Sequence, residues 1–169
     1  MLIVKDSMVL IHLAVVGVLR EACMMFGQVK IPNAVHEEVV ERGIAANHAD
    51  AFIVQKLEKK DYIKVVAAID TMLMSEMKKY GLQGGELEAV TLYIQEKADL
   101  IASNDEKVRR LRLILNLDLV SSPEIVYLLA KNRVIAKDRA LECLCALKKI
   151  GWFSDIVLNF VRMEVEKLE

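Results

Sequence analysis

The chain has 169 residues, a net charge of −1, 54% apolar residues and 28% charged residues. This length suits one globular domain with a substantial core, and the near-zero charge argues against nucleic-acid binding through overall basicity, although local basic patches still count. The longest apolar run, from Met8 to Leu19, contains His12 and is shorter than the roughly 20 residues that a membrane span needs.

The first part of the chain alternates strand-like and helical segments. A strand at residues 2–5 leads into a helix from Ser7, whose hydroxyl is a good N-cap. An extended piece at residues 29–31 leads into a helix after Pro32, a residue favoured in the first turn. A helix over residues 49–59 then precedes a strand at residues 62–66.

The same alternation continues, which indicates a parallel sheet covered by helices on both faces. We expect a helix at 71–79, a helix from the Gly84-Gly85 turn to Lys97, a strand at 100–102, a helix at 105–115 and a strand at 118–120. Residues 1–122 are therefore predicted to form an α/β core. Residues 123–169 read as three amphipathic helices, broken near Asn132 and Gly151, that pack on the core or on a dimer partner.

The cysteines Cys23, Cys143 and Cys145 form neither a CxxC pair nor an even set, and the histidines share no ligand spacing with them. This pattern disfavours zinc and indicates free thiols in a reducing compartment. Lys5 and Asp6 interrupt the N-terminal apolar run, so a signal peptide is disfavoured and a cytoplasmic location is expected. The apolar surplus predicts a homo-oligomer, most simply a dimer.

Four acidic residues that are far apart in the sequence each lie where a strand ends or a helix begins: Asp6, Glu38, Glu86 and Asp105. In a parallel α/β sheet such positions meet at the carboxyl ends of the strands. Carboxylates held together repel one another unless a divalent cation neutralises them. Together they point to metal-assisted phosphodiester chemistry, although each acid taken alone is better explained as a helix cap or a surface charge.

Helical phase selects among neighbouring acids. Val35 and Val39 mark the buried direction of their helix, so Glu38 lies beside that direction and Glu37 points towards water. By the same argument Glu86 lies closer to the apolar stripe of its helix than Glu88 does. Glu86 also lies in the first turn, where the helix dipole favours an anion, so capping alone could explain it.

A basic cluster follows Asp105 and consists of Lys107, Arg109, Arg110 and Arg112. Such a run is usually a solvated helix face. Here it would flank the acidic site, where Lys107, Arg109 or Arg110 could hold the phosphates of a polynucleotide.

The chain resembles PIN-domain proteins, the nuclease family that includes the VapC toxins of toxin–antitoxin pairs. Four segments carry the resemblance: LIVKDSMVLIHL, VKIPNAVHEEVV, GLQGGELEAVTLY and DLIASNDEKVRRL. The tail segments SSPEIVYLLAKNRVI and LKKIGWFSDIVLNFV are similar to the helical end of a prokaryotic subgroup, so the resemblance covers nearly the whole chain. It implies a three-layer α/β/α fold with a parallel central sheet and a helical C-terminal extension.

The resemblance implies that Asp6, Glu38, Glu86 and Asp105 are a catalytic, metal-binding quartet for Mg²⁺ or Mn²⁺, and that Ser7 and Ser103 are accompanying hydroxyl residues. Relatives often carry two adjacent aspartates where this chain has Asn104-Asp105. We expect Asp105 to be the ligand; if Asn104 takes that position instead, the site loses a charge.

The implied activity is that of a metal-dependent endoribonuclease, with RNA as substrate and an antitoxin protein as a further partner. The alternative is a catalytically weak or inactive PIN scaffold that binds RNA or protein.

Overall fold

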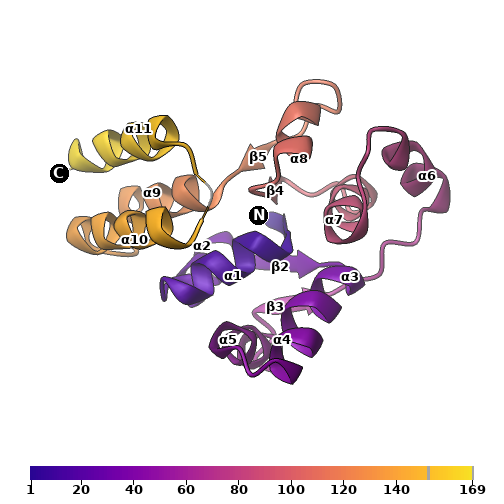
Figure 1. The fold of residues 1–169 in the computed structure, drawn as a ribbon, viewed down its shortest axis with the longest axis horizontal. Helices are drawn as coiled ribbons and strands as arrows, with labels where there is room; N and C mark the ends of the chain where they lie inside the picture. Colours follow the sequence, from indigo (N-terminus) through magenta and orange to yellow (C-terminus); the bar gives the residue numbers. More distant parts are fainter. Residues whose placement is uncertain (152, 169) are drawn as a thin grey trace.

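The computed structural model describes residues 1–151 and 153–168; Trp152 and Glu169, both in the predicted C-terminal part, lie outside the described residues. Its centre is a five-stranded parallel sheet in the order β3-β2-β1-β4-β5 (Figure 1). The strands are β1 (Leu2–Lys5), β2 (Gln28–Ile31), β3 (Ile63–Val65), β4 (Leu100–Ala102) and β5 (Leu119–Val120).

The central strand β1 pairs with β2 on one side and with β4 on the other. Ile3 is in register with Val29 of β2, and Val4 is in register with Ile101 of β4. All of these side chains are buried, as expected for parallel strands with both faces covered. The predicted parallel sheet is therefore confirmed.

Alternate residues of the strands enter two separate cores, which makes the fold three-layered. Ile3 and Ala102 contribute to one core, and Val4 and Ile101 contribute to the other. The first core is covered by α1 (Ser7–Val15), α2 (Leu19–Phe26), α5 (Ala49–Glu58) and the C-terminal helices. The second is covered by α6 (Thr71–Lys79), α7 (Gly84–Gln95) and α8 (Glu106–Leu111).

One continuous helical segment follows β2. It begins with α3 (Asn33–His36), widens to π-helical hydrogen bonding over η1 (Glu37–Arg42), and ends with α4 (Gly43–Ala45). Short π-helical turns inside α-helices are frequent at functional sites, and Glu38 lies in this one.

The C-terminal part consists of α9 (Ser122–Lys131), α10 (Lys137–Ile150) and α11 (Asp155–Glu166), which gather beside α2 in Figure 1. The predicted breaks are found, since Asn132 ends α9 and Gly151 ends α10. Val126, Leu144 and Val161 of these helices lie in the same core as the sheet residue Ile3. Among the described residues, no helix is both long and apolar enough to cross a bilayer.

The helix that begins at Ser7 stops at Val15, and the chain turns at Gly17, whose positive φ of 74° favours glycine, before α2 begins. Two predicted helix boundaries are wrong. The helix expected to reach Leu115 stops at Leu111, because Leu113 beyond it is 91% exposed and adds no packing. Gly84 and Gly85, expected to form a turn before the helix, are instead the first residues of α7.

Candidate functional site

The strand order reverses between β1 and β4, because β1 continues to β2 on one side while β4 lies on the other. Ligands of open α/β sheets bind at such a switch point, outside the carboxyl ends of the strands. Asp6 directly follows β1, and its backbone N–H donates to the Ala102 carbonyl at the end of β4, at 3.0 Å. The polar residues after β1 and β4 are therefore held next to one another.

A small cavity of about 90 Å³ lies at this place and collects all four predicted carboxylates. We call it the acidic pocket; its lining residues are Asp6, Ser7, Met8, Glu38, Gly85, Glu86 and Asp105. Ser103, Asn104, Lys107, Arg109 and Arg110 were also predicted as site residues but do not line it.

Glu38 reaches the acidic pocket from η1 and is anchored there by α1. The Ser7 hydroxyl donates a hydrogen bond of 2.6 Å to Oε2 of Glu38. The neighbouring Glu37 faces the surface, where its Oε1 lies 2.7 Å from the Arg42 guanidinium. Ser7 thus orients Glu38, as hydroxyl and amide groups around ligating carboxylates commonly do.

Glu86 enters from the first turn of α7, which it also caps. Its Oε1 accepts from the Gln83 backbone N–H at 3.2 Å and lies 3.5 Å from the Lys107 ammonium. Its neighbour Glu88 points elsewhere and accepts a hydrogen bond of 2.9 Å from the backbone N–H of Ala34. Glu86 therefore both caps α7 and lines the acidic pocket, so the capping role expected from the sequence and a place in the site are compatible.

Gly85 allows α7 to approach α1 and α3 closely. A Cβ at this position would lie 3.3 Å from the Ser7 hydroxyl oxygen and 3.4 Å from Oε2 of Glu38. Any side chain would therefore press on the Ser7–Glu38 hydrogen bond. The absence of a Cβ at Gly85, rather than a turn conformation, is what the acidic pocket uses.

Asp6 is the most buried of the four carboxylates, at 5% exposure. Burial raises its pKa to about 6, and the charge of Asp105 adds to this shift, while hydrogen bonds from the Ser103 hydroxyl and from the backbone N–H groups of Val9 and Asn104 oppose it. An anion in this environment is costly without a cation nearby. The acidic pocket is therefore electrostatically suited to a positive ligand.

The preceding residue, Lys5, does not supply that cation. Its side chain is buried in the core, and its ammonium lies 5.1 Å from the centre of the Phe26 ring. Burial lowers the pKa of Lys5 to about 8. In a β-strand and its continuation, consecutive side chains point to opposite faces, so Lys5 and Asp6 serve different environments.

Asp105 and Asn104 point in different directions. Asp105 lines the acidic pocket and caps α8, with its Oδ1 accepting from the Lys107 and Val108 backbone N–H groups at 2.7 and 3.1 Å. Asn104 instead turns to α1 and α9, where its Nδ2 donates to the Ser122 hydroxyl at 2.7 Å and lies 3.0 Å from Nδ1 of His12. Asn104 thus ties the end of β4 to the helices behind it.

Replacing Asn104 by alanine should destabilise the protein. The buried Ser122 backbone N–H donates to Oδ1 of Asn104 at 2.9 Å, and Asn104→Ala would leave it without a partner, at a cost of about 2 kcal/mol. Chemical denaturation would measure this loss. Asn159→Ala, on the exposed side of α11, is the matched control and should change stability by no more than about 0.5 kcal/mol; equal effects of the two substitutions would contradict the anchoring role.

The donor set suits a hard divalent cation, since all four groups are carboxylates. As placed, however, no three His, Cys, Asp or Glu residues within 1–151 and 153–168 converge closely enough to hold one ion. The hydrogen bonds to Ser7, Gln83 and Val108 occupy one oxygen each of Glu38, Glu86 and Asp105 and leave the second oxygen of each carboxylate available. A cation would therefore be held by these residues partly through water.

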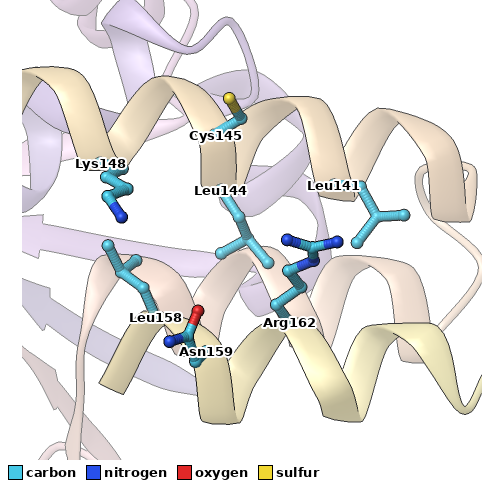
Figure 2. A pocket seen from close by; sticks show the side chains of 7 residues that line it. All are labelled: Leu141, Leu144, Cys145, Lys148, Leu158, Asn159 and Arg162. Carbon is cyan, nitrogen blue, oxygen red and sulfur yellow. The ribbon is translucent and has the colours of Figure 1, made fainter. Parts of the chain in front are cut away.

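A second cavity, of about 350 Å³, lies between α10 and α11. Figure 2 shows its leucine side chains Leu141, Leu144 and Leu158 with the basic ends of Lys148 and Arg162. Both basic groups already have partners, because Lys148 lies 2.7 Å from Asp155 and Arg162 lies 2.8 Å from Glu166. Among residues 1–151 and 153–168, no acidic residue and no predicted site residue lines this cavity.

The fold and the acidic pocket define an α/β protein with a carboxylate site at the switch point of a parallel sheet. A family model described as a PIN domain matches residues 2–166, and the chain belongs to this family. PIN domains are generally nucleases that use divalent metals and act on RNA. Searches of curated proteins and of solved structures find no match to the chain.

Three features around the site differ from the sequence-based expectation or lie outside it. Gly85 lies in α7 rather than in a turn, His12 contacts Asn104, and Lys107 pairs with Glu86. A Gly-Glu pair at a helix start is a detectable sign of close backbone approach. The other two contacts join residues 92 and 21 positions apart and leave no local pattern in the sequence.

Proposed function

We propose that this protein is a metal-dependent endoribonuclease that hydrolyses RNA phosphodiester bonds at the acidic pocket. The observation that carries the proposal is the meeting of Asp6, Glu38, Glu86 and Asp105 in one cavity at the switch point of the sheet. The raised pKa of the buried Asp6 supports it, because perturbed carboxylates gather at functional sites.

The roles we assign follow from position. Asp6 and Asp105, which follow β1 and β4, would hold Mg²⁺ or Mn²⁺. Glu38 from η1 and Glu86 from α7 would add further negative charge to the same site. Bound there, the ion supplies an activated water and neutralises charge on the phosphate. Ser7 keeps Glu38 in place, and Lys107 at 3.5 Å from Glu86 balances part of the negative charge before substrate and ion bind.

The test compares wild type with Asp6→Asn on single-stranded RNA, with Mn²⁺ and then with chelator. We expect wild type to cleave only with Mn²⁺, and Asp6→Asn to be at least about a hundredfold slower, a loss of about 3 kcal/mol in transition-state stabilisation. Equal cleavage by both proteins would indicate a contaminating nuclease and overturn the proposal. Asp70→Asn, a surface N-cap aspartate of α6 that accepts from Leu73 N–H at 2.9 Å, is the matched control and should retain full activity.

A second candidate is a PIN scaffold without catalysis that binds RNA or protein. The observation that favours it is the lack of three converging metal ligands among the described residues. The two candidates differ in metal binding, because a scaffold without a site gains no stability from Mn²⁺.

The proposed function includes an antitoxin protein as a binding partner and a homodimer as the oligomeric state. Support for an association surface comes from α11, where Ile156, Phe160 and Met163 are exposed on one side of the helix.

A further inference from the structure

A separate cavity of about 170 Å³ lies beside the acidic pocket, at the carboxyl ends of β4 and β5. Its polar lining consists of Ser103, Arg109, Arg112, Ser121 and Glu124. This volume is several times the roughly 30 Å³ of a water molecule, so a phosphate group has room to enter. We call this cavity the arginine pocket.

Arg109 and Arg112 line the arginine pocket together because they are three positions apart, one on α8 and one directly after it. Among the described residues, neither guanidinium lies within 4 Å of a carboxylate. The other two basic residues of the cluster are already engaged: Lys107 with Glu86 at 3.5 Å, and Arg110 with Glu106 at 3.1 Å.

Glu124, the one acidic residue among the described residues that line the arginine pocket, is also engaged. Oε2 of Glu124 accepts from the Ser121 backbone N–H and hydroxyl, both at 2.7 Å, in the capping box of α9. Two arginines and one glutamate leave a formal charge of +1 in the cavity. Unpaired guanidinium groups present several N–H donors in a plane, which is the geometry that binds phosphate oxygens in pairs.

Ser103 connects the arginine pocket to the acidic pocket. It lines the arginine pocket, and its hydroxyl accepts a 3.1 Å hydrogen bond from the backbone N–H of Asp105. Asp6 and Asp105 both line the acidic pocket. A strand of RNA with one phosphodiester at the acidic pocket would therefore carry a neighbouring phosphate past Arg109 and Arg112.

We infer that the arginine pocket is a binding subsite for an internal backbone phosphate next to the scissile one, held by Arg109 and Arg112. The inference rests on the proposed function, because the phosphate belongs to the same RNA. With Arg109 and Arg112 bound to this phosphate, the RNA would run across the carboxyl ends of β1, β4 and β5.

The first test measures binding of a short single-stranded RNA in EDTA, where cleavage does not interfere. Arg109→Gln/Arg112→Gln should bind about tenfold or more weakly than wild type. The slope of log affinity against log salt should fall by about 0.7 for each phosphate that the variant no longer neutralises. Arg20→Gln/Arg133→Gln removes the same charge from exposed positions outside both pockets and should leave affinity and slope nearly unchanged.

The second test locates the phosphate with RNAs that each carry one uncharged methylphosphonate linkage. In wild type, one linkage beside the cut site should cost about tenfold in kcat/KM, and in the arginine variant the same replacement should cost nothing further. The same assay compares RNAs with and without a 5′-phosphate. If kcat/KM falls when the 5′-phosphate is removed and not when the internal linkage is replaced, the internal-phosphate assignment is overturned. A melting temperature and a Mn²⁺ stabilisation equal to those of wild type would show that the double arginine variant folds. If the double variant does not fold, the single variant Arg112→Gln is used for the same test.

The outcomes separate the two proposals. RNA cleavage by wild type together with unaltered binding and cleavage by the arginine variant would overturn the subsite alone. Binding that depends on Arg109 and Arg112, with no metal-dependent cleavage of any RNA, would overturn the nuclease proposal and leave supported only the binding of an RNA phosphate by these two arginines, without a scissile neighbour.

Discussion

Asp6→Asn is expected to make the metal-free protein more stable at pH 7.5, by about 3 kcal/mol, although it removes a residue assigned to catalysis. Burial raises the pKa of Asp6 from 3.8 to about 6. Between pH 4 and pH 6 the folded protein therefore holds a proton that the unfolded chain has released, and the free energy of unfolding falls as the pH rises. Above pH 6 the folded wild type bears the full free-energy cost of burying the ionised Asp6 carboxylate, and a neutral asparagine avoids this cost.

Asparagine resembles the protonated carboxyl group of Asp6: its amide oxygen keeps the N-cap bond from the Val9 N–H, at 2.9 Å in wild type, while its amide nitrogen cannot accept the Asn104 N–H that Oδ2 of Asp6 accepts at 3.3 Å. Urea denaturation in EDTA at pH 7.5 and at pH 4 would measure the difference, which should nearly vanish at the lower pH. The control Asp70→Asn exchanges the same cap at an exposed position and should differ from wild type by no more than about 0.5 kcal/mol at pH 7.5. If Asp6→Asn were less stable than wild type at pH 7.5, the ionised Asp6 carboxylate would not destabilise the metal-free fold.

Saturating Mn²⁺ is expected to stabilise wild type at pH 7.5 and to do so much less at pH 5. A ligand at a hundred times its Kd adds about 2.7 kcal/mol to the free energy of unfolding, which corresponds to roughly 5–10 °C in Tm for a domain of this size. The pKa of Asp6 is about 6, so at pH 5 the ion must displace a proton before it binds. Thermal melts with and without Mn²⁺ at both pH values would show this.

The location of the ion is tested by the same melts on two variants. Asp6→Asn should lose most of the Mn²⁺ effect at pH 7.5, whereas Asp70→Asn should keep it, because Asp70 lies outside the acidic pocket. A full Mn²⁺ shift in Asp6→Asn would mean that the ion binds elsewhere. No shift in wild type would favour the scaffold candidate over the nuclease.

Much of the fold follows from local patterns in the chain. The apolar runs at β1 and β4 and the helical periodicity between them depend on neighbouring residues, and the alternation of strand and helix then implies parallel pairing. Helix ends were predicted less well because they depend on what the last turn packs against. The helix after Asp105 stops at Leu111 since Leu113 finds no core to enter.

The site could be predicted only in part. Helical phase indicated the direction of Glu38 from Val35 and Val39, because a regular helix fixes the angle between side chains. No such rule applies to the irregular residues after β4, so the sequence left Asn104 and Asp105 as alternatives. Their directions depend on Ser122, which lies 18 residues beyond Asn104 and binds its side chain.

The sequence by itself determined the residue types of the site and the elements that carry them: four acids at strand ends and helix starts, followed by a run of basic residues. Only the tertiary structure decided which oxygens share a pocket, which basic groups already have partners, and that Arg109 and Arg112 remain unpaired beside Ser103 among the described residues. The physical reason is that residue type and periodicity are local properties of the chain. Charge pairing and burial are set by contacts between segments that the strand order β3-β2-β1-β4-β5 brings together.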